Sequence, residues 1–135
     1  MSDLVLTGPA SPRRSDVVRG GAWMEPLALD LPVRSHAIGA YVEMYGVAAL
    51  TSRYRLRAEL RDRATGDLRD LPIQPAGESG FRSTWERRPS EGGVTAEFVS
   101  IWLGDVPPGR YVLRLVADIS GAGGPLSAEQ ALDRR

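Results

Sequence analysis

The sequence predicts an all-β domain built as an antiparallel sandwich, and three observations support that fold class. Apolar and charged residues alternate along residues 53–62, and along 111–118 an apolar set (Tyr111, Leu113, Leu115, Ala117) alternates with a mixed set that includes Arg114 and Asp118. This period of two places the two sets on opposite faces of a strand. Turn residues follow both stretches, at 63–67 and at 120–125. The chain also spreads 15 glycines and 10 prolines over its 135 residues, which would interrupt long helices. We therefore expect residues 1–135 to form one domain.

Weaker signals indicate the remaining strands. Residues 37–47 and 95–103 are rich in Tyr, Val, Ile and Phe, which favour strands. A short strand is expected at 4–6, and two prolines restrict residues 23–33 to the edge of a sheet. The least regular segments are 68–73 and 81–85, expected as a weak pair of strands, and 127–132, which fits a short helix, a last strand or a tail.

About seven short strands separated by turns are typical of an immunoglobulin-like sandwich, which is the architecture we predict. Its core should contain the apolar residues that share one face of each strand. The expected core residues are Tyr54, Leu56, Leu60, Phe98, Trp102, Tyr111, Leu113 and Leu115.

Tyr111 has a more specific structural role in this prediction. It follows the segment Pro107-Pro108-Gly109-Arg110, where the chain must turn into a strand. In Greek-key sandwiches a tyrosine at such a corner packs its ring in the core while its hydroxyl bonds to nearby backbone. We therefore expect Tyr111 to form a tyrosine corner.

The charge balance and composition exclude several classes of partner. All 17 basic residues are arginines, and 17 acidic residues balance them, so the net charge is zero. Non-specific nucleic-acid binding needs a positive field, so no nucleic acid is expected as a partner. No apolar run approaches the ~18 residues of a membrane-spanning helix, so no membrane insertion is expected. Residues 1–14 lack the apolar segment of a signal peptide, so an exported protein would contain this chain as a mature form or an excised piece.

Few residues are suited to catalysis or cofactor binding. The chain has one histidine, His36, and neither cysteine nor lysine, which removes the commonest bases and nucleophiles. A hydrolase would need His36 beside a carboxylate, and the sequence has no Gly-x-Ser-x-Gly elbow. Asp67 and Asp70 beside Gly66 form at most a loose calcium site, because no Asp-x-Asp-x-Asp-Gly loop is present. The sequence therefore predicts no catalytic centre, no metal site and no cofactor.

Tyrosine and arginine gather on two consecutive predicted strands, 37–47 and 53–62. Both residue types are enriched at protein interfaces, and strands joined by a short loop usually pair as neighbours. We therefore expect the two strands to form a hairpin that displays a contact surface, with one tryptophan near a polar loop as a further contact. The residues of this predicted surface are Tyr41, Glu43, Tyr45, Arg55, Arg57 and Trp85.

Two structural alternatives stay open for these residues. The tyrosine rings could be half-buried, with Glu43 paired to Arg55 or Arg57 on a neighbouring strand. The arginines, together with Arg53 and Arg61, could keep an outer sheet face soluble while acidic residues of adjacent strands balance them.

The order of the predicted pieces also resembles a known family. The pieces are the opening segment at 2–6, an edge segment at 23–32, a Tyr-x-Glu-x-Tyr strand at 41–45, the alternating strand at 54–60 and the Pro-Pro-Gly-Arg-Tyr segment at 107–111. This order resembles the C-terminal β-sandwich region of bacterial GWxTD-domain proteins over nearly the whole chain. The Gly-Trp-x-Thr-Asp motif itself is absent from the sequence. The resemblance implies an immunoglobulin-like module of a larger protein, a periplasmic or extracellular setting, and no catalytic residues.

Together these observations predict a non-catalytic interaction or structural module of an exported or cell-envelope protein, with a protein as its partner. A carbohydrate-binding module is the alternative if aromatic residues stand exposed in a row, and its partner would be a polysaccharide. A small hydrolase is the third class, and it depends on His36.

Overall fold

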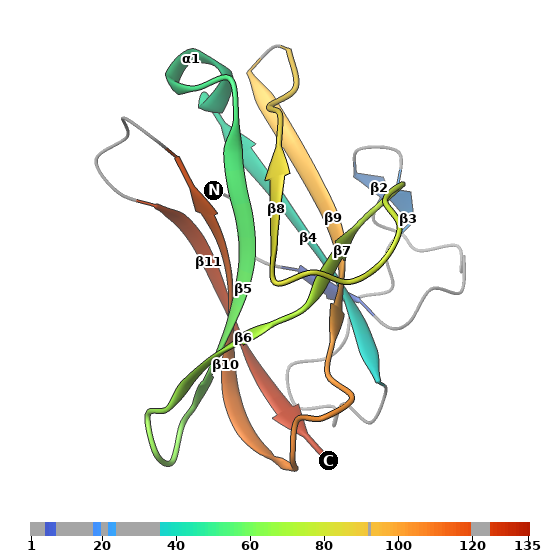
Figure 1. Ribbon diagram of the computed structural model, residues 1–135, viewed down its shortest axis with the longest axis vertical. Coiled ribbons are helices and arrows are strands. Elements are labelled where there is room, and N and C mark those ends of the chain that lie inside the picture. Colours follow the sequence, from blue (N-terminus) through green and yellow to red (C-terminus); the bar gives the residue numbers. More distant parts are fainter. Residues whose placement is uncertain (1–4, 8–17, 20–21, 24–35, 92, 120–124) are drawn as a thin grey trace.

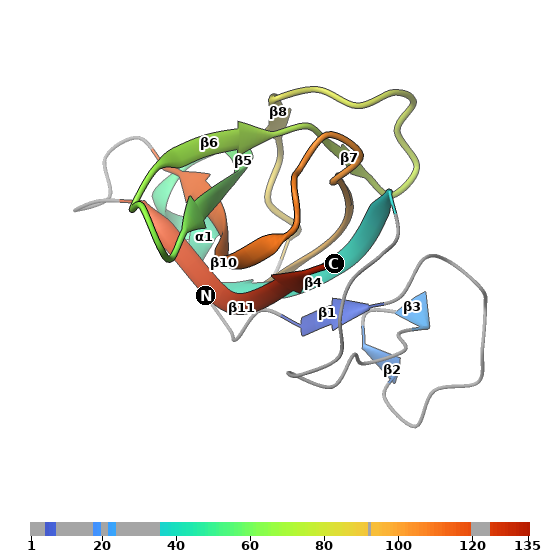
Figure 2. The same ribbon diagram turned by 90° about the horizontal axis from the view of Figure 1, so that it is seen from below.

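A computed structural model describes residues 5–7, 18–19, 22–23, 36–91, 93–119 and 125–135. Two antiparallel sheets pack on either side of one core (Figures 1 and 2). The first sheet, termed sheet I, has the strand order β1-β4-β9-β7, and the second, termed sheet II, has the order β11-β10-β5-β6, with β8 also paired to β5. The bounds in sheet I are β1 (Val5–Thr7), β4 (Ala37–Tyr45), β9 (Val94–Trp102) and β7 (Ile73–Pro75). Those in sheet II are β11 (Leu126–Arg134), β10 (Gly109–Asp118), β5 (Tyr54–Asp62), β6 (Leu68–Leu71) and β8 (Thr84–Arg87).

The strand order is that of an immunoglobulin-like sandwich. In that fold strands A, B, E and D form one sheet and strands C, F and G form the other. Here β1, β4, β9 and β7 take the first set of places, and β5, β10 and β11 take the second. The prediction of an all-β antiparallel sandwich is confirmed. The short strands β6 and β8 add to this order along β5, and the separate pair β2 (Val18–Arg19) and β3 (Ala22–Trp23) and the one-turn helix α1 (Val47–Leu50) complete the described elements.

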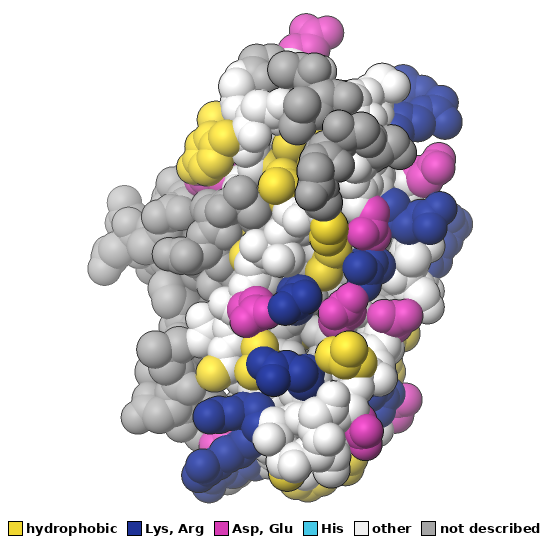
Figure 3. Space-filling view, turned by 90° about the vertical axis from the view of Figure 1, so that its left-hand side faces the viewer, with side chains coloured by type: hydrophobic (Ala, Val, Ile, Leu, Met, Phe, Trp, Pro, Cys, Tyr) yellow, Lys and Arg dark blue, Asp and Glu magenta, His cyan; other side chains and the backbone are white. Residues whose placement is uncertain are grey.

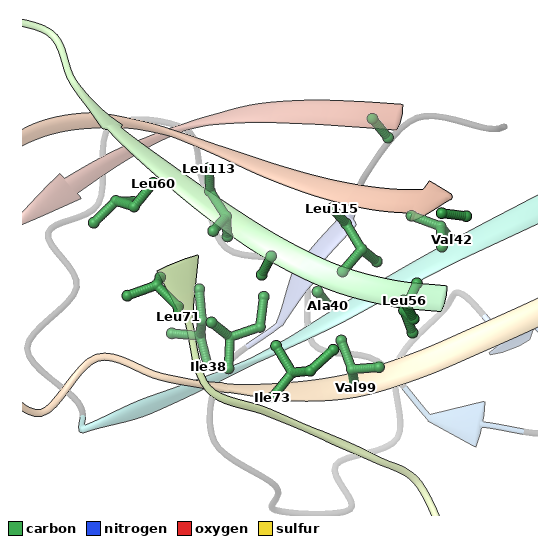
Figure 4. Close-up of a cluster of buried hydrophobic side chains, with 14 of the residues drawn as sticks. Ile38, Ala40, Val42, Leu56, Leu60, Leu71, Ile73, Val99, Leu113 and Leu115 are labelled. Atoms are coloured by element: carbon green, nitrogen blue, oxygen red, sulfur yellow. The ribbon is translucent and has the colours of Figure 1, made fainter. Parts of the chain in front are cut away.

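Alternate residues of the long strands fill the space between the sheets (Figure 4). Leu56 and Leu60 of β5 and Leu113 and Leu115 of β10 are fully buried, as the alternation predicts. Tyr54 and Tyr111 are buried with them, so six of the eight expected core residues are confirmed. Sheet I supplies the opposing side chains, which are Ile38, Ala40, Val42, Met44, Ile73, Val99 and Ile101.

The other two expected core residues, Phe98 and Trp102, were predicted on the wrong face of their strand. The buried positions of β9 are Thr95, Glu97, Val99 and Ile101. The register with β4 pairs Ile101 with Ile38, so both side chains enter the core together. Phe98 and Trp102 have the opposite parity and lie on the outer face of sheet I, where Trp102 is 39% exposed. The prediction favoured Phe98 and Trp102 because they are large and apolar. The inward face of β9 instead carries two polar residues, Thr95 and Glu97, beside Val99 and Ile101.

The connection from β4 to β5 changes sheets. Gly46 adopts a left-handed conformation with φ of 73° and begins α1, which carries the chain across the end of the sandwich. Its amide donates to the Gly93 carbonyl at 3.0 Å, which ties this end to the start of β9. The predicted hairpin of these two strands is therefore wrong: β4 pairs with β1 and β9, whereas β5 pairs with β10, β6 and β8 (Figure 1).

The weaker predicted segments have mixed outcomes. Segments 68–73 and 81–85 share only the bridge between Ile73 and Arg82, because β6 and β8 both pair with β5 instead. Segment 127–132 forms a strand as part of β11. The edge strand expected at 23–33 lies outside the described residues beyond Trp23.

Two polar contacts close the lower end of the sandwich. The Tyr111 hydroxyl donates to the Pro107 carbonyl at 2.7 Å, and a Cβ at Gly109 would lie 3.3 Å from the tyrosine ring. This is the geometry of a tyrosine corner, with glycine giving the ring room. At the end of β11 the buried Arg134 guanidinium donates to the Leu103 carbonyl at 3.1 Å and to the Val106 carbonyl at 3.3 Å. The last strand is thereby tied to the loop that precedes β10.

The corner hydrogen bond can be tested by Tyr111→Phe, which removes only the hydroxyl. We expect the free energy of unfolding to fall by about 1 kcal/mol, the typical net value of one hydrogen bond. Urea unfolding measures the loss. Tyr45→Phe, which removes an exposed hydroxyl, is the control and should cost less than half as much. Equal losses in the two variants would contradict the structural role of the corner.

Candidate functional site

Tyr41, Glu43 and Tyr45 lie on one face of β4, the outer face of sheet I. The Tyr41 hydroxyl donates to Glu43 Oε1 at 3.1 Å, and the Tyr45 hydroxyl donates to Glu43 Oε2 at 2.8 Å. The two hydroxyls therefore orient a single carboxylate. Tyr45 is 55% exposed, whereas Tyr41 is 2% exposed, so the two rings do not form an exposed row.

Arg55 and Arg57 lie on the opposite side of the molecule, on the outer face of sheet II. Arg57 Nε donates to Asp118 Oδ2 at 2.7 Å, and the same guanidinium bonds to Glu59 on its own strand. These hydrogen bonds, that with Asp118 first, raise the pKa of the Arg57 guanidinium above its ordinary range. Next along the same face, Arg114 Nε donates to Glu129 Oε1 at 2.9 Å. Acidic residues of neighbouring strands thus balance the arginines on this face.

Arg55 occupies a shallow polar depression at the end of sheet II that opens to solvent, with a volume of about 430 Å³. Its cross-strand neighbours are Glu86 on β8 and Asp118 on β10, which are both acidic. Arg53 lines the same depression and lies 3.7 Å from Glu86. The depression is lined by charges of both signs that face each other.

The predicted contact surface is therefore divided between two faces. Because β4 and β5 belong to different sheets, Glu43 cannot pair with Arg55 or Arg57, and that alternative is also wrong. The tyrosines and Glu43 stay together on sheet I through the two hydrogen bonds described above, and Arg55 and Arg57 stay together on sheet II.

Trp85 is a core residue and not a surface contact, so its prediction is wrong. The residue is 7% exposed and belongs to the buried cluster between the sheets. Its indole Nε1 donates to the Ile73 carbonyl at 2.7 Å, across to the neighbouring sheet. The Arg82 guanidinium covers the ring at 4.4 Å from its centroid. The sequence suggested exposure because Thr84 and Glu86 flank Trp85, but these two residues lie on the outward face of β8.

His36 contributes to an aromatic cluster at the lower end of sheet I. Its ring stacks on Trp102 with centroids 5.8 Å apart and planes 18° apart, and Phe81 packs against the same indole at 5.7 Å. Phe81 is 40% exposed, close to the exposure of Trp102. The indole lies against Gly104, where a Cβ would come within 2.5 Å of ring atom Cζ2. This cluster, defined as His36, Phe81 and Trp102, brings together residues that the sequence did not connect.

Acidic and metal-binding groups do not gather around His36 in the described part of the chain. No hydrogen bond or ion pair joins its ring to a described Asp or Glu. Within the described ranges no three His, Asp or Glu side chains converge as metal ligands, and this includes Asp67 and Asp70. The described segments also contain no helix long and apolar enough to span a membrane.

A buried polar cluster links the two sheets, and the sequence did not reveal it. Glu97 of β9 is 4% exposed and projects from sheet I into the interior. Its Oε2 accepts a hydrogen bond from the Tyr54 hydroxyl at 2.8 Å and another from Arg87 Nε at 2.9 Å. Arg87 Nη2 donates to the other carboxylate oxygen at 3.0 Å, which makes the pair bidentate.

The three residues of this cluster come from three strands. Tyr54 of β5 and Arg87 of β8 are direct cross-strand partners in sheet II, so both face Glu97 from the opposite layer. The hydrogen bond with Glu97 raises the pKa of the Arg87 guanidinium. Burial, and then the nearby Glu97 carboxylate, raise the pKa of the Tyr54 hydroxyl well above its ordinary value of 10.0. The arrangement places the Tyr54 hydroxyl and the Arg87–Glu97 pair in one site between the sheets, with Arg87 partly exposed at its rim.

A comparison with protein-family models finds no match, and a comparison with curated proteins also finds none.

The inter-sheet cluster can be tested with Glu97→Gln, which keeps the size of the side chain. The substitution removes the carboxylate that accepts charge-assisted hydrogen bonds from Arg87, while the partly exposed Arg87 keeps its ion pair with Glu78 at 3.3 Å. We therefore expect a loss of about 2 kcal/mol in the free energy of unfolding. Chemical denaturation measures the loss. Glu59→Gln, at an ion pair on the outer face of sheet II, is the matched control and should cost about 1 kcal/mol or less. A loss for Glu97→Gln as small as that of the control would contradict the bridging role.

The raised pKa of Tyr54 predicts a loss of stability in alkali. Above pH 10 the tyrosine of the unfolded chain releases its proton, while Tyr54 of the folded chain retains it. The contribution of Tyr54 to the free energy of unfolding is therefore full below pH 10 and declines as pH rises. The decline for this group approaches about 1.4 kcal/mol for each pH unit. Tyr54→Phe should lower stability at neutral pH and flatten the alkaline decline. Urea unfolding between about pH 9 and pH 12 measures both slopes, and identical slopes in the two proteins would contradict the assignment.

Proposed function

We propose that this chain is a non-catalytic interaction module that binds a protein through the outer face of sheet I. The observation that carries this proposal is the contrast between the two outer faces. Sheet II presents mainly charged side chains that are paired with one another, such as Arg57 with Asp118 and Arg114 with Glu129, beside one exposed leucine, Leu68. Sheet I presents apolar and aromatic side chains around one carboxylate, that of Glu43.

The exposed apolar groups of sheet I lie at both ends of its outer face. Tyr45 and Val94 are cross-strand partners at one end, 55% and 46% exposed. Trp102 lies at the other end of β9, with Phe81 and His36 against it. Exposed aromatic residues of this kind dominate the energetics of protein interfaces, because they supply large contact areas with polar edges.

The electrostatics favour the same face. Docking a partner on sheet II would take several hydrogen-bonded ion pairs out of water, and their desolvation opposes binding. On sheet I the partner would cover apolar surface, and Glu43 already receives two tyrosine hydroxyls. A partner with an apolar centre flanked by hydrogen-bond donors fits this surface.

A polysaccharide is the second candidate, and the partly exposed indole of Trp102 supports it. Sugar rings pack on aromatic faces, and Phe81 lies beside the indole with 40% of its surface exposed. A sugar-binding row of exposed aromatic residues is not complete on this surface, because Tyr41 and Trp85 are buried. Protein binding therefore ranks first.

We also propose a cell-envelope or exported setting, as a module of a larger protein. The support for this setting is the resemblance of the strand order and motifs to the sandwich region of GWxTD-domain proteins. The Tyr-x-Glu-x-Tyr strand and the tyrosine corner are the elements that carry it, and both lie in long strands of the sandwich.

The test uses immobilised protein to capture partners from an envelope extract, with three chains compared. We expect the double variant Val94→Ser/Trp102→Ser to lower the amount of captured partner protein by about tenfold or more. Arg61→Ser, on the exposed face of sheet II, is the matched control and should capture as much as the unchanged chain. Circular dichroism and melting curves check that all three are folded.

Other outcomes decide against the proposal. Equal capture by all three chains, or a loss confined to Arg61→Ser, would contradict a contact face on sheet I. If the Val94/Trp102 variant loses binding to a polysaccharide panel while captured protein is unchanged, the second candidate replaces the first.

A further inference from the structure

The edge of sheet II formed by β11 differs from the other described sheet edges. The strand has nine residues and pairs along its full length with β10, from Leu126 opposite Ala117 to Arg134 opposite Gly109. Among the described strands β11 has no second neighbour. The other edge strands are three or four residues long, namely β1, β7, β6 and β8.

Proteins usually protect their sheet edges with short strands, prolines or bulges. The edges on the other side of this sandwich follow the rule, since β7 is short and ends in Pro75. In contrast, β11 contains no proline, and its register with β10 runs without a bulge. A long and regular edge offers a row of backbone donors and acceptors to another strand.

We propose that β11 pairs in antiparallel fashion with β11 of a second copy of this chain, about a two-fold axis at Gln130. Sheet II would then continue from one copy into the other. This inference rests on the edge strand alone and is independent of the proposed contact face on sheet I.

The pattern of charges on β11 selects this register. With Gln130 opposite Gln130, all nine residues are paired, Glu129 faces Ala131, and Asp133 faces Ser127. No like charges then stand directly opposite each other. Moving the two-fold axis by one residue toward Leu126 places Glu129 opposite Glu129. Moving it by one residue toward Arg134 places Glu129 opposite Asp133. Like charges directly opposite each other destabilise a strand pair, so the central register is favoured.

The faces of the two strands also match in this register. Ala128 and Leu132 are buried on the inner face of β11, and they pair with each other across the axis. The two Glu129 side chains lie on a diagonal of the outer face. Each carboxylate already accepts a hydrogen bond from Arg114, which offsets their repulsion. In the view of that side of the molecule, acidic and basic side chains alternate over the surface (Figure 3).

The size of the contact indicates a weak dimer. Nine paired residues extend over about 30 Å, and a single strand pair buries less surface than a permanent interface does. We therefore expect self-association that depends on concentration, with a monomer at low concentration.

Cross-linking gives a direct test, because the chain has no cysteine of its own. Cβ atoms of directly opposed residues lie about 4.5–5.5 Å apart, close to what a disulfide spans. We expect Gln130→Cys to form a disulfide-linked dimer under mild oxidation. The matched control is Gln74→Cys on β7, the other glutamine of the sequence, which should remain monomeric.

Sedimentation with charge variants tests the two-fold axis itself. Gln130→Lys and Gln130→Glu should each raise the concentration needed for dimers by about tenfold or more, because each places like charges at the axis. An equimolar mixture of the two should associate at least as well as the unchanged chain. Melting curves confirm that both variants are folded. An unchanged chain that stays monomeric at millimolar concentration would overturn the proposal, and so would equal cross-linking of both cysteine variants or a mixture that associates no better than either charge variant alone.

Discussion

The buried carboxylate of Glu97 is the constraint on which the relation between the two sheets depends. It projects from β9 into a largely apolar interior and meets Tyr54 and Arg87 from the opposite layer. An ionised group in such a place is tolerated only when its hydrogen bonds are satisfied. The two sheets can therefore pack only in the alignment that brings these three side chains together. An apolar core alone would tolerate small sliding movements between the layers, whereas hydrogen-bond geometry does not.

The same constraint sets the chemistry of the outer surface. Because Glu97 faces inward, the parity of β9 places Phe98 and Trp102 outward, beside the tyrosines of β4. Sheet I thus acquires an aromatic outer face as a consequence of a polar contact in the core. Sheet II has apolar side chains inside and mainly charged side chains outside, together with Leu68 and Val112. The contrast between the two faces, on which the proposed binding role rests, arises from pleat geometry in both layers.

Both ends of the sandwich are fixed by polar contacts to the backbone. Gly46 and α1 carry the chain between the sheets at one end, while the tyrosine corner and Arg134 close the other. The two surfaces proposed for binding are the aromatic face of sheet I and the long edge at β11. They lie on different strands, so the two proposals involve no common contact residue.

The sequence by itself determined the fold class, the long strands β5 and β10, and most of their core residues. Apolar residues at every second position of 53–62 and 111–118 are a local property, and burial of that face follows directly from it. The tyrosine-corner geometry was likewise expected from a short local segment, Pro107–Tyr111. Only the tertiary structure decided which sheet each strand joins and which face of β9 and β8 is buried. Tyr41 and Arg55 lie close in sequence but on opposite faces, because α1 crosses between the layers. Trp85 and Glu97 are buried because partners far along the chain, the Ile73 carbonyl for one and Tyr54 with Arg87 for the other, satisfy their polar atoms. No local pattern encodes such partners, since strand pairing and layer packing join residues that the sequence keeps apart.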